Sequence, residues 1–223
     1  MKRYYKSSEN PSNINSLCER KILIVGAGPS GLLLALLLAQ RNIPSVVLEG
    51  YDYLDTRLRA TQYGVPATRV FRRAGILEDI RAASIGSFPT IKWRRVSDKE
   101  VLTGIDMSCV KDHPDRMTIL QLGEIIKIMY RHCLERGKGL IEVKFQHRVT
   151  SVGQDGGKAW ADVEVGEEKK NVRFEADYII GCDGATSAVR RSLFGREWPG
   201  QTFDYQFIVQ NVVFALQSST NLS

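Results

Sequence analysis

The sequence has few residues that could form cross-links or a metal site. Its 223 residues include four cysteines and three histidines, with no Cys-x-x-Cys pair and no His-x-x-x-His spacing. Small disulfide scaffolds and zinc sites both depend on such regular spacing. We therefore expect reduced thiols, no metal site and a cytoplasmic location. Cys182 lies between apolar residues and a turn, and we expect it to be a small buried thiol, not a nucleophile.

Long apolar runs are also scarce. Residues 22–39 approach the roughly 20 apolar residues that a membrane helix requires, but a glycine-rich motif interrupts them. The break leaves a short strand and a short helix, so we expect no membrane span. Residues 1–20 have no apolar centre and are expected to form a flexible polar tail, not a signal or transit peptide. No internal repeat occurs, and 43% hydrophobic residues exclude disorder as the main theme.

Basic residues exceed acidic ones by 31 to 25, and the excess is local. Residues 57–95 contain nine basic and two acidic residues, while the rest of the chain is close to neutral. Such a patch could attract an anionic nucleotide. Nucleic-acid binding is not expected, because no aromatic interleaving or recognition helix accompanies the charge. A solvated helix face with Arg69, Arg72 and Arg73 is the plain alternative.

A glycine-rich motif follows the first apolar run. Residues 21–25 are a continuous run rich in Ile, Leu and Val, which predicts a buried parallel strand. The motif comes directly after it and consists of Gly26, Ala27, Gly28, Pro29, Ser30 and Gly31. Glycines at this spacing allow a tight turn, let backbone N–H groups approach a pyrophosphate and let the next helix pack on the strand. We expect that helix over residues 32–41.

An acidic residue ends the second predicted strand, at residues 45–48. Glu49 lies 18 residues after Gly31, where a carboxylate can accept hydrogen bonds from an adenosine ribose. A solvated carboxylate at a strand end is the alternative. Strand, glycines, helix, second strand and acid in this order predict a dinucleotide-binding unit, although they do not distinguish NAD from FAD.

Two later segments bear on the choice of cofactor. Arg57 and Arg59 have one residue between them in a segment predicted to be extended, so they should point to opposite sides, and one could bind phosphate. Two solvated arginines are the alternative. Much later, an apolar strand at 177–181 leads into Asp183, with Thr186 or Ser187 placed to cap a helix over 188–194. The Asp183 carboxylate could bind a ribose or order backbone amides, or it could satisfy only its own turn.

These motifs together resemble one protein family. G-A-G-P-S-G, R-x-R-A after the second strand, Gln121 at the start of a long helix and C-D-G-A-T-S-x-V-R are similar to the FAD-dependent aromatic hydroxylases. These single-component flavoprotein monooxygenases are typified by p-hydroxybenzoate and phenol hydroxylases. The resemblance spans about residues 21–210 and implies an α/β fold: a Rossmann-like FAD-binding domain with a parallel sheet and a β-meander, plus an incomplete antiparallel substrate-binding sheet.

The resemblance also implies a reaction and roles for particular residues. The reaction is hydroxylation of an aromatic or related electron-rich small molecule with NAD(P)H and O2. The residues implied to bind FAD are Gly26, Gly28, Pro29, Ser30 and Gly31 at the pyrophosphate, Glu49 at the adenosine ribose, Arg59 beside the phosphates, Gln121 near the ribityl chain, and Asp183 and Gly184, a pair also implicated with NAD(P)H. Without the family, Gln121 is an ordinary polar residue at a helix start. No catalytic acid or base is implied, and His113 is expected to be a loop residue.

The remaining patterns predict how the chain is divided. Short strands at 90–95 and 100–106 should leave the nucleotide domain for the substrate sheet. Strands at 140–145, 148–154, 158–164 and 171–174 resemble an antiparallel meander, and residues 203–216 resemble another strand of the substrate sheet. We therefore expect a discontinuous FAD-binding domain over 21–89 and 110–197, with a partial substrate-binding sheet over 90–109 and 198–223.

One motif of the resembled family is missing. Its members usually continue further and carry a Gly-Asp-Ala-x-His motif beside the flavin, and no Gly-Asp-Ala occurs here. We therefore expect a chain truncated at its C-terminus, which is either a monooxygenase or a non-catalytic FAD- or nucleotide-binding remnant. An NAD-dependent dehydrogenase is weakened by the separate Asp-Gly motif and by the predicted meander. The sequence does not specify the substrate or the oligomeric state.

Overall fold

The computed structural model describes residues 22–57, 59–86, 90–197, 199–201 and 203–206. The predicted tail at 1–20 and most of the predicted strand at 203–216 lie outside these residues. Residues 203–206 are described and form no strand.

The described residues form both helices and strands, in a mixed order. The helices are α1 (Pro29–Ala39), α2 (Val65–Arg73), α3 (Leu77–Ala83), α4 (Leu122–Arg136) and α5 (Ala188–Phe194), with a 3-10 turn at Ser108–Val110. The strands are β1 (Ile22–Val25), β2 (Ser45–Leu48), β3 (Gln62–Tyr63), β4 (Thr90–Arg94), β5 (Val101–Asp106), β6 (Thr118–Ile119), β7 (Ile141–Lys144), β8 (His147–Gln154), β9 (Ala159–Val165), β10 (Lys170–Ala176) and β11 (Tyr178–Gly181). The α/β class is therefore confirmed.

A parallel sheet forms the centre, with the strand order β11-β1-β2-β7. The prediction for β7 was wrong, because it places this strand in the antiparallel meander. Instead Ser45 pairs with Ile141 in a parallel register. The reason is the long helix α4, which carries the chain back so that β7 starts from the same end of the sheet as β2. A short strand does not reveal its direction in its own residues.

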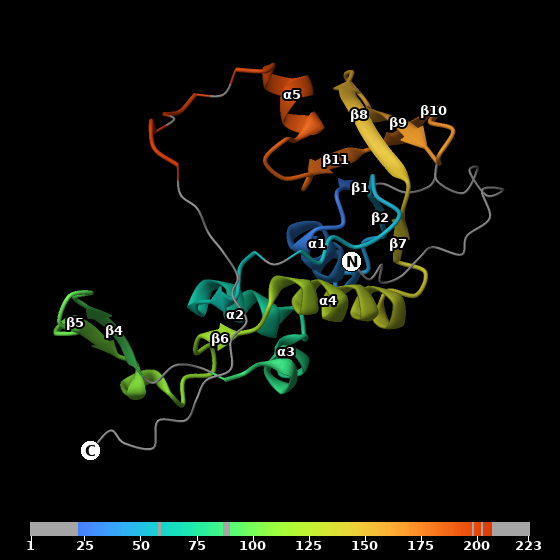
Figure 1. Ribbon diagram of the computed structural model, residues 1–223. Coiled ribbons are helices and arrows are strands. Elements are labelled where there is room, and N and C mark those ends of the chain that lie inside the picture. Colours follow the sequence, from blue (N-terminus) through green and yellow to red (C-terminus); the bar gives the residue numbers. More distant parts are fainter. Residues whose placement is uncertain (1–21, 58, 87–89, 198, 202, 207–223) are drawn as a thin grey trace.

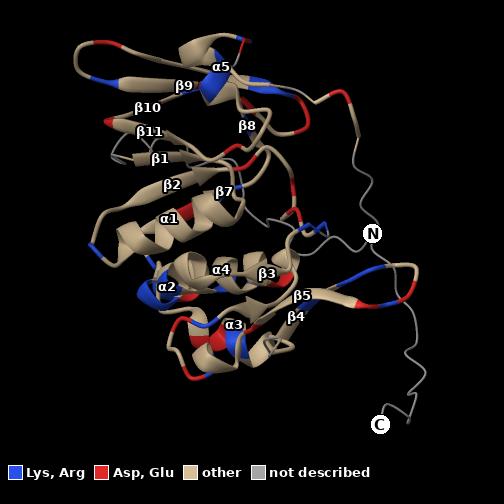
Figure 2. Cartoon of the chain, turned by 90° about the vertical axis from the view of Figure 1, so that its left-hand side faces the viewer, with Lys and Arg blue, Asp and Glu red and all other residues tan. Residues whose placement is uncertain are grey.

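Alternation along the central strands produces two hydrophobic cores. In β1, Leu23 and Val25 face one side of the sheet and Ile24 faces the other. Ile24 packs in a core with residues of α1 and α4, while Leu23 and Val25 pack with residues of the meander and α5. Figures 1 and 2 show these layers, with the meander and α5 over one face and α1 and α4 over the other. Both faces of the parallel sheet are covered, as parallel sheets require.

The meander consists of β8, β9 and β10 in an antiparallel sheet. Its inward residues Ala161, Val163 and Phe174 are buried against the central sheet. The predicted strands at 148–154, 158–164 and 171–174 are confirmed as these three, each with slightly different ends.

The helices begin where the local chemistry favours them. α1 starts at Pro29, three residues before the predicted start, because proline suits the first turn of a helix. Its 11 residues are strongly apolar, yet within the described residues no helix has both the length and the hydrophobicity to cross a membrane. α5 has the predicted bounds, and α4 begins directly after Gln121, where a long helix was predicted, with Gly137 as its C-cap residue. Helix α3 and the two-residue strands β3 and β6 were not predicted.

A hairpin of β4 and β5 stands apart from the other strands. The two strands pair only with each other among the described residues, and Figure 1 shows them projecting beyond α2 and β6. Hydrogen bonds join the two segments that flank the hairpin, and we call this junction the neck. There the Ile85 N–H donates to the Ile119 oxygen, and the Ile119 N–H donates to the Gly86 oxygen, each at 3.2 Å. The hairpin is thus an insertion between two segments that are bonded to each other.

Candidate functional site

The glycine motif forms the turn between β1 and α1. Gly26 adopts φ +101°, a conformation that favours glycine, and its N–H donates to the Leu48 oxygen at 2.8 Å. A Cβ atom on Gly31 would lie 2.0 Å from the Gly26 oxygen, so the turn cannot admit a side chain at position 31. These two glycines are required by the fold of the turn itself.

Gly28 is different, because a Cβ atom there would meet nothing within 4 Å. Its backbone is extended, which any residue can adopt, so the fold alone does not explain a glycine. Within the described residues no side chain caps α1 at Gly28, and its first turn carries no acidic residue. The open space and the uncapped helix start together form a cradle that a phosphate group would fill.

Glu49 lies directly beside this cradle, at the end of β2. Its Oε2 accepts a hydrogen bond from the Ala27 N–H at 2.8 Å, and its Oε1 accepts one from the Tyr51 N–H at 2.9 Å. The half-buried carboxylate is therefore fixed against the glycine turn and is not a freely solvated strand end. Each carboxylate oxygen can accept a second hydrogen bond, which a ribose hydroxyl could donate.

The Asp-Gly motif meets the same edge from β11. The Cys182 N–H donates to the Val25 oxygen at 2.8 Å, and a Cβ atom on Gly26 would lie 2.6 Å from the Cys182 oxygen. Two motifs more than 150 residues apart in the sequence are thus in contact. Gly184 adopts φ +76°, and a Cβ atom there would meet nothing within 4 Å.

The Asp183 carboxylate accepts hydrogen bonds at the start of α5. Its Oδ2 accepts hydrogen bonds from the N–H groups of Ala188 at 2.6 Å and Val189 at 3.3 Å, and its Oδ1 accepts one from the Ser187 hydroxyl at 2.6 Å. Ser187 in turn accepts from the Arg190 N–H at 2.9 Å, so Ser187 is the capping residue of the two that were predicted. The carboxylate therefore orders backbone amides, one of the two roles that its position suggested.

The segments that contain Arg59 and Gln121 meet at the start of α4. The Leu122 N–H donates to the Ala60 oxygen at 3.0 Å, which pairs the arginine segment with the helix start. Gln121 is exposed at the N-cap, where its side chain makes no capping bond. A Cβ atom on Gly123 would lie 2.7 Å from the Thr56 oxygen, so a glycine is needed for this close contact.

The predicted opposite orientation of the two arginines was wrong. Arg57 donates to Asp55 Oδ1 from Nε at 2.8 Å and to Oδ2 from Nη2 at 2.7 Å, and Arg59 also donates to Oδ2. The described residues of this segment form no strand, and both guanidinium groups reach one carboxylate. The hydrogen bonds from Arg57 lower the pKa of Asp55 to about 2.

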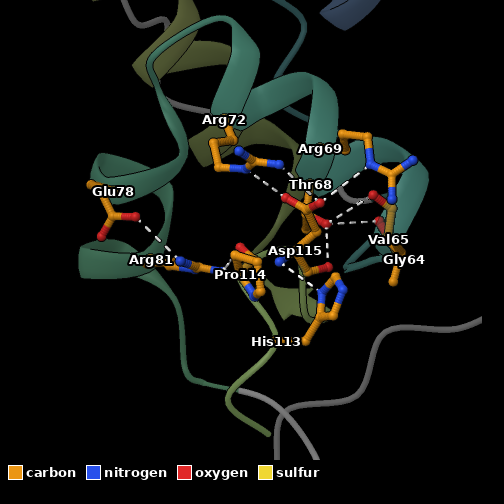
Figure 3. Close-up of polar contacts among 10 residues, drawn as sticks. All are labelled: Gly64, Val65, Thr68, Arg69, Arg72, Glu78, Arg81, His113, Pro114 and Asp115. Carbon is orange, nitrogen blue, oxygen red and sulfur yellow. Dashed lines mark hydrogen bonds and ion pairs between the residues drawn. The ribbon is translucent and has the colours of Figure 1, made fainter. Parts of the chain in front are cut away.

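Much of the positive charge of residues 57–95 is paired with acidic residues that lie outside this range. Asp115 is buried and accepts hydrogen bonds from Arg72 Nε at 2.7 Å, Arg72 Nη2 at 3.1 Å and Arg69 Nε at 3.2 Å. Figure 3 shows these contacts, together with the Thr68 hydroxyl, which donates to the Asp115 backbone oxygen at 2.6 Å. Neither of these arginines belongs to a purely solvated face. Figure 2 shows the mixed charges over α2 and α3.

Two side chains with possible reactivity have structural roles. His113 Nδ1 accepts a hydrogen bond from the Asp115 N–H at 3.0 Å, so His113 is a turn residue that supports Asp115. Burial and the neighbouring Asp183 raise the pKa of the Cys182 thiol, which disfavours a thiolate nucleophile. Asp55 and Asp115, by contrast, organise four arginines and were not singled out from the sequence.

Comparisons with known proteins agree with this geometry. A family model described as FAD binding domain matches residues 19–222. The chain is 32% identical over 196 residues to 6-hydroxy-3-succinoylpyridine 3-monooxygenase of Pseudomonas putida, covering 88% of this chain and 49% of that protein. It is 30% identical over 195 residues to para-nitrophenol 4-monooxygenase of a Pseudomonas species, covering 86% and 47%. The chain thus spans about half the length of these relatives.

The chain is also similar to a solved structure of a monooxygenase. The crystal structure of p-nitrophenol 4-monooxygenase from Pseudomonas putida matches with a TM-score of 0.68 and 26% identity, covering 78% of this chain and 43% of that chain. The family resemblance seen in the sequence is confirmed. The chain therefore belongs to the FAD binding domain family of the FAD-dependent aromatic hydroxylases, and its cofactor is FAD.

Proposed function

We propose that the chain is the cofactor-binding part of a monooxygenase that hydroxylates an aromatic or related electron-rich small molecule with NAD(P)H and O2. The observation that carries this proposal is the meeting of three elements at one sheet edge: the uncapped glycine turn after β1, Glu49 after β2 and the Asp-Gly turn after β11. Ligands of open α/β sheets bind at the carboxyl ends of the strands. The named activities of the relatives support the substrate class.

Each predicted site residue has a proposed role in holding FAD. The glycine turn, with Gly26, Gly28, Pro29, Ser30 and Gly31, holds the pyrophosphate at the start of α1. Glu49 accepts hydrogen bonds from the adenosine ribose, and Asp183 and Gly184 form the wall of the site at β11. Arg59 and Gln121 approach the cofactor from the start of α4, where Arg59 would exchange its contact with Asp55 for one with phosphate.

In this arrangement FAD and the residues of the chain have different roles. When bound, FAD supplies the redox chemistry with O2 that amino-acid side chains lack. The residues of this chain bind and orient the cofactor, and we assign no acid or base among them. Three of the four cysteines are described and free, which fits the proposed cytoplasmic location, where thiols stay reduced.

We also propose that residues 21–89 and 110–197 form the cofactor domain, and that 90–109 and 198–223 belong to the substrate-binding sheet. The support is that β4 and β5 pair only with each other among the described residues, while hydrogen bonds between Ile85, Gly86 and Ile119 join the segments that flank the hairpin. The hairpin presents exposed apolar residues, including Trp93 and Ile105, that a larger sheet would cover.

The test starts with the purified 223-residue chain. FAD binding is followed by quenching of flavin fluorescence, and oxidation of NADH and NADPH is then measured with and without phenolic compounds. We expect bound flavin and oxidation that phenolic compounds stimulate. Bound flavin without stimulated turnover would contradict the monooxygenase proposal for this chain and favour a non-catalytic FAD-binding protein. A chain that binds NAD+ but no FAD would point to a dehydrogenase instead.

A further inference from the structure

The β4–β5 hairpin presents an apolar face outside the two hydrophobic cores. Ile91 and Ile105 are paired, and Trp93 lies two residues after Ile91 on β4, so the three side chains lie on one face. Trp93 and Ile105 are about half exposed. A two-stranded hairpin without further packing is marginally stable in water. The position of this hairpin must therefore be set by the segments at its two ends.

The segment that returns from β5 is a continuous series of hydrogen-bonded turns. The Ser108 N–H donates to Asp106 Oδ1 at 2.8 Å. Backbone N–H groups then donate to the oxygen three residues earlier, from Val110 to Met107, Lys111 to Ser108, His113 to Val110 and Arg116 to His113. Because these bonds overlap from Asp106 to Arg116, β5 leads into the residues around Asp115 without a free linker. The hairpin is consequently fixed to whatever holds Asp115.

Asp115 binds this segment to helix α2. Its carboxylate accepts hydrogen bonds from Arg69 and Arg72, and its backbone oxygen accepts one from the Thr68 hydroxyl at 2.6 Å. Figure 3 shows the carboxylate between the two guanidinium groups. The Asp115 side chain is only 3% exposed, and a buried carboxylate is stable only where such partners meet it. Asp115 thus has one favourable place on α2, and we call its bonds to Thr68, Arg69 and Arg72 the Asp115 anchor.

Helix α3 and the residues after it hold the neighbouring positions. Arg81 Nη2 donates to the Pro114 oxygen at 2.7 Å, directly before Asp115. The Ser84 hydroxyl donates to the Ile119 oxygen at 2.9 Å and accepts a hydrogen bond from the Gly86 N–H at 2.9 Å, beside the backbone bonds of the neck. The segments before β4 and after β5 are therefore bonded to α2, to α3 or to each other.

We propose that Asp115 is a positioning residue: the Asp115 anchor sets the position of the β4–β5 hairpin, and with it the apolar face that the hairpin contributes to the substrate-binding sheet. This inference rests on the proposed function, because it takes the role of the hairpin from it. The partners of the anchor lie in α2, whereas the glycine turn, Glu49 and the Asp-Gly turn follow β1, β2 and β11. Loss of the anchor should change substrate binding and leave FAD binding unchanged.

The test measures the position of the hairpin in the full chain. Spin labels are attached to ketone-bearing amino acids at the positions of Val96, which is 98% exposed in the hairpin turn, and Glu135, which is exposed on α4. Pulsed electron paramagnetic resonance then gives the distribution of distances between the labels. We expect a narrow distribution in the wild type and one at least about twofold wider in Asp115→Asn and Arg72→Met, because local restraints are lost.

Functional measurements on the same variants separate positioning from stability. FAD affinity should equal that of the wild type, and where phenolic compounds stimulate oxidation, their KM should rise about tenfold with little change in kcat. A residue that only stabilises the fold would lower the melting temperature without widening the distance distribution. If Asp115→Asn does not fold, Arg72→Met and Thr68→Val decide, since both keep the buried carboxylate and its contact with Arg69.

Asp98→Asn is the matched control. Asp98 contacts Arg95 at 2.7 Å within the hairpin turn, so this variant removes an aspartate–arginine contact and leaves the Asp115 anchor in place. It should keep the narrow distance distribution of the wild type. Equal widening in Asp98→Asn would show that any change of charge near the hairpin alters its position, and would overturn the role of the anchor.

Three further results would overturn the inference. The first is a wild-type distribution as wide as that of Asp115→Asn, and the second is an unchanged distribution in all the anchor variants. The third is a loss of FAD affinity as large as the rise in KM, because it would assign Asp115 to the cofactor domain as a whole. A wild-type chain that binds no FAD contradicts the proposed function instead, and the distance distributions then still decide whether Asp115 positions the hairpin.

Discussion

At the scale of single residues, two glycines of one motif are present for different reasons. Gly31→Ala would place a Cβ atom 2.0 Å from the Gly26 oxygen, so we expect it to lower the free energy of unfolding by about 3 kcal/mol or to prevent folding. Gly28→Ala meets nothing within 4 Å and should keep the wild-type melting temperature, but its methyl group would occupy the proposed phosphate position and weaken FAD binding. Thermal melts and fluorescence titrations separate the two effects. Wild-type FAD affinity in Gly28→Ala would contradict the phosphate site.

The buried carboxylate of Asp115 should make stability depend on acidity. Hydrogen bonds from Arg72 lower its pKa from 3.8 to about 2. A lowered pKa means that the contribution is complete above about pH 4 and is lost as the pH falls through about 2. Asp115→Asn should therefore be less stable than the wild type at neutral pH, and the difference should shrink between pH 4 and pH 2. Urea unfolding at several pH values measures it.

Asp98→Asn is the control for this prediction. Asp98 also contacts an arginine, Arg95, at 2.7 Å, but both side chains are about half exposed. An exposed ion pair contributes little, so Asp98→Asn should have nearly the wild-type stability at neutral pH. Equal losses in the two variants would mean that burial of Asp115 does not matter.

Asp115 and Asp55 show which ion pairs can be predicted from the sequence and which cannot. Asp115 lies 43 residues from Arg72, and nothing in the local pattern relates the two. The count of charges over residues 57–95 consequently treated Arg69 and Arg72 as uncompensated. Asp55 is a different case, because it lies two residues before Arg57 and four before Arg59, and this spacing was available in the sequence.

At the scale of elements, strong local signals were predicted well and non-local pairings were not. The bounds of α4 and α5 follow from helical spacing of apolar residues, with Gly137 ending the first and Ser187 capping the second. The direction of β7 depends on how α4 crosses the sheet, and the two-residue strands β3 and β6 exist only because they pair with each other. The site was predictable to the same degree: its motifs are local, while their contact at Gly26 and Cys182 is not.

The start of α5 offers a test of what Asp183 does. Ser187→Ala removes one cap and should cost about 1 kcal/mol of unfolding free energy, and Asp183→Ala removes hydrogen bonds to two backbone N–H groups and should cost about 2 kcal/mol. If Asp183 also faces FAD, its variant should lose more FAD affinity than Ser187→Ala does. Chemical denaturation and flavin titration measure both quantities. Equal losses of affinity would assign Asp183 to the helix alone.

At the scale of the whole molecule, the two antiparallel strand groups differ in how much the fold depends on them. In the meander, Ala161, Val163 and Phe174 are at most 4% exposed and belong to a hydrophobic core. In the β4–β5 hairpin, Trp93 and Ile105 are 48% and 47% exposed. Burial of apolar surface stabilises a fold, so the first group should be essential to the cofactor domain and the second dispensable.

Excision tests this difference directly. Replacing residues 90–109 with a flexible Gly-Ser linker leaves the neck at Ile85 and Ile119, and the two cores described for the central sheet, in place. We therefore expect a folded chain that binds FAD with the affinity of the full chain, measured by circular dichroism and flavin titration. The same linker in place of residues 159–176 should abolish folding, because it removes the buried faces of β9 and β10. Loss of FAD binding on excision of 90–109 would mean that the hairpin belongs to the cofactor site, and the discontinuous domain would then have to include it.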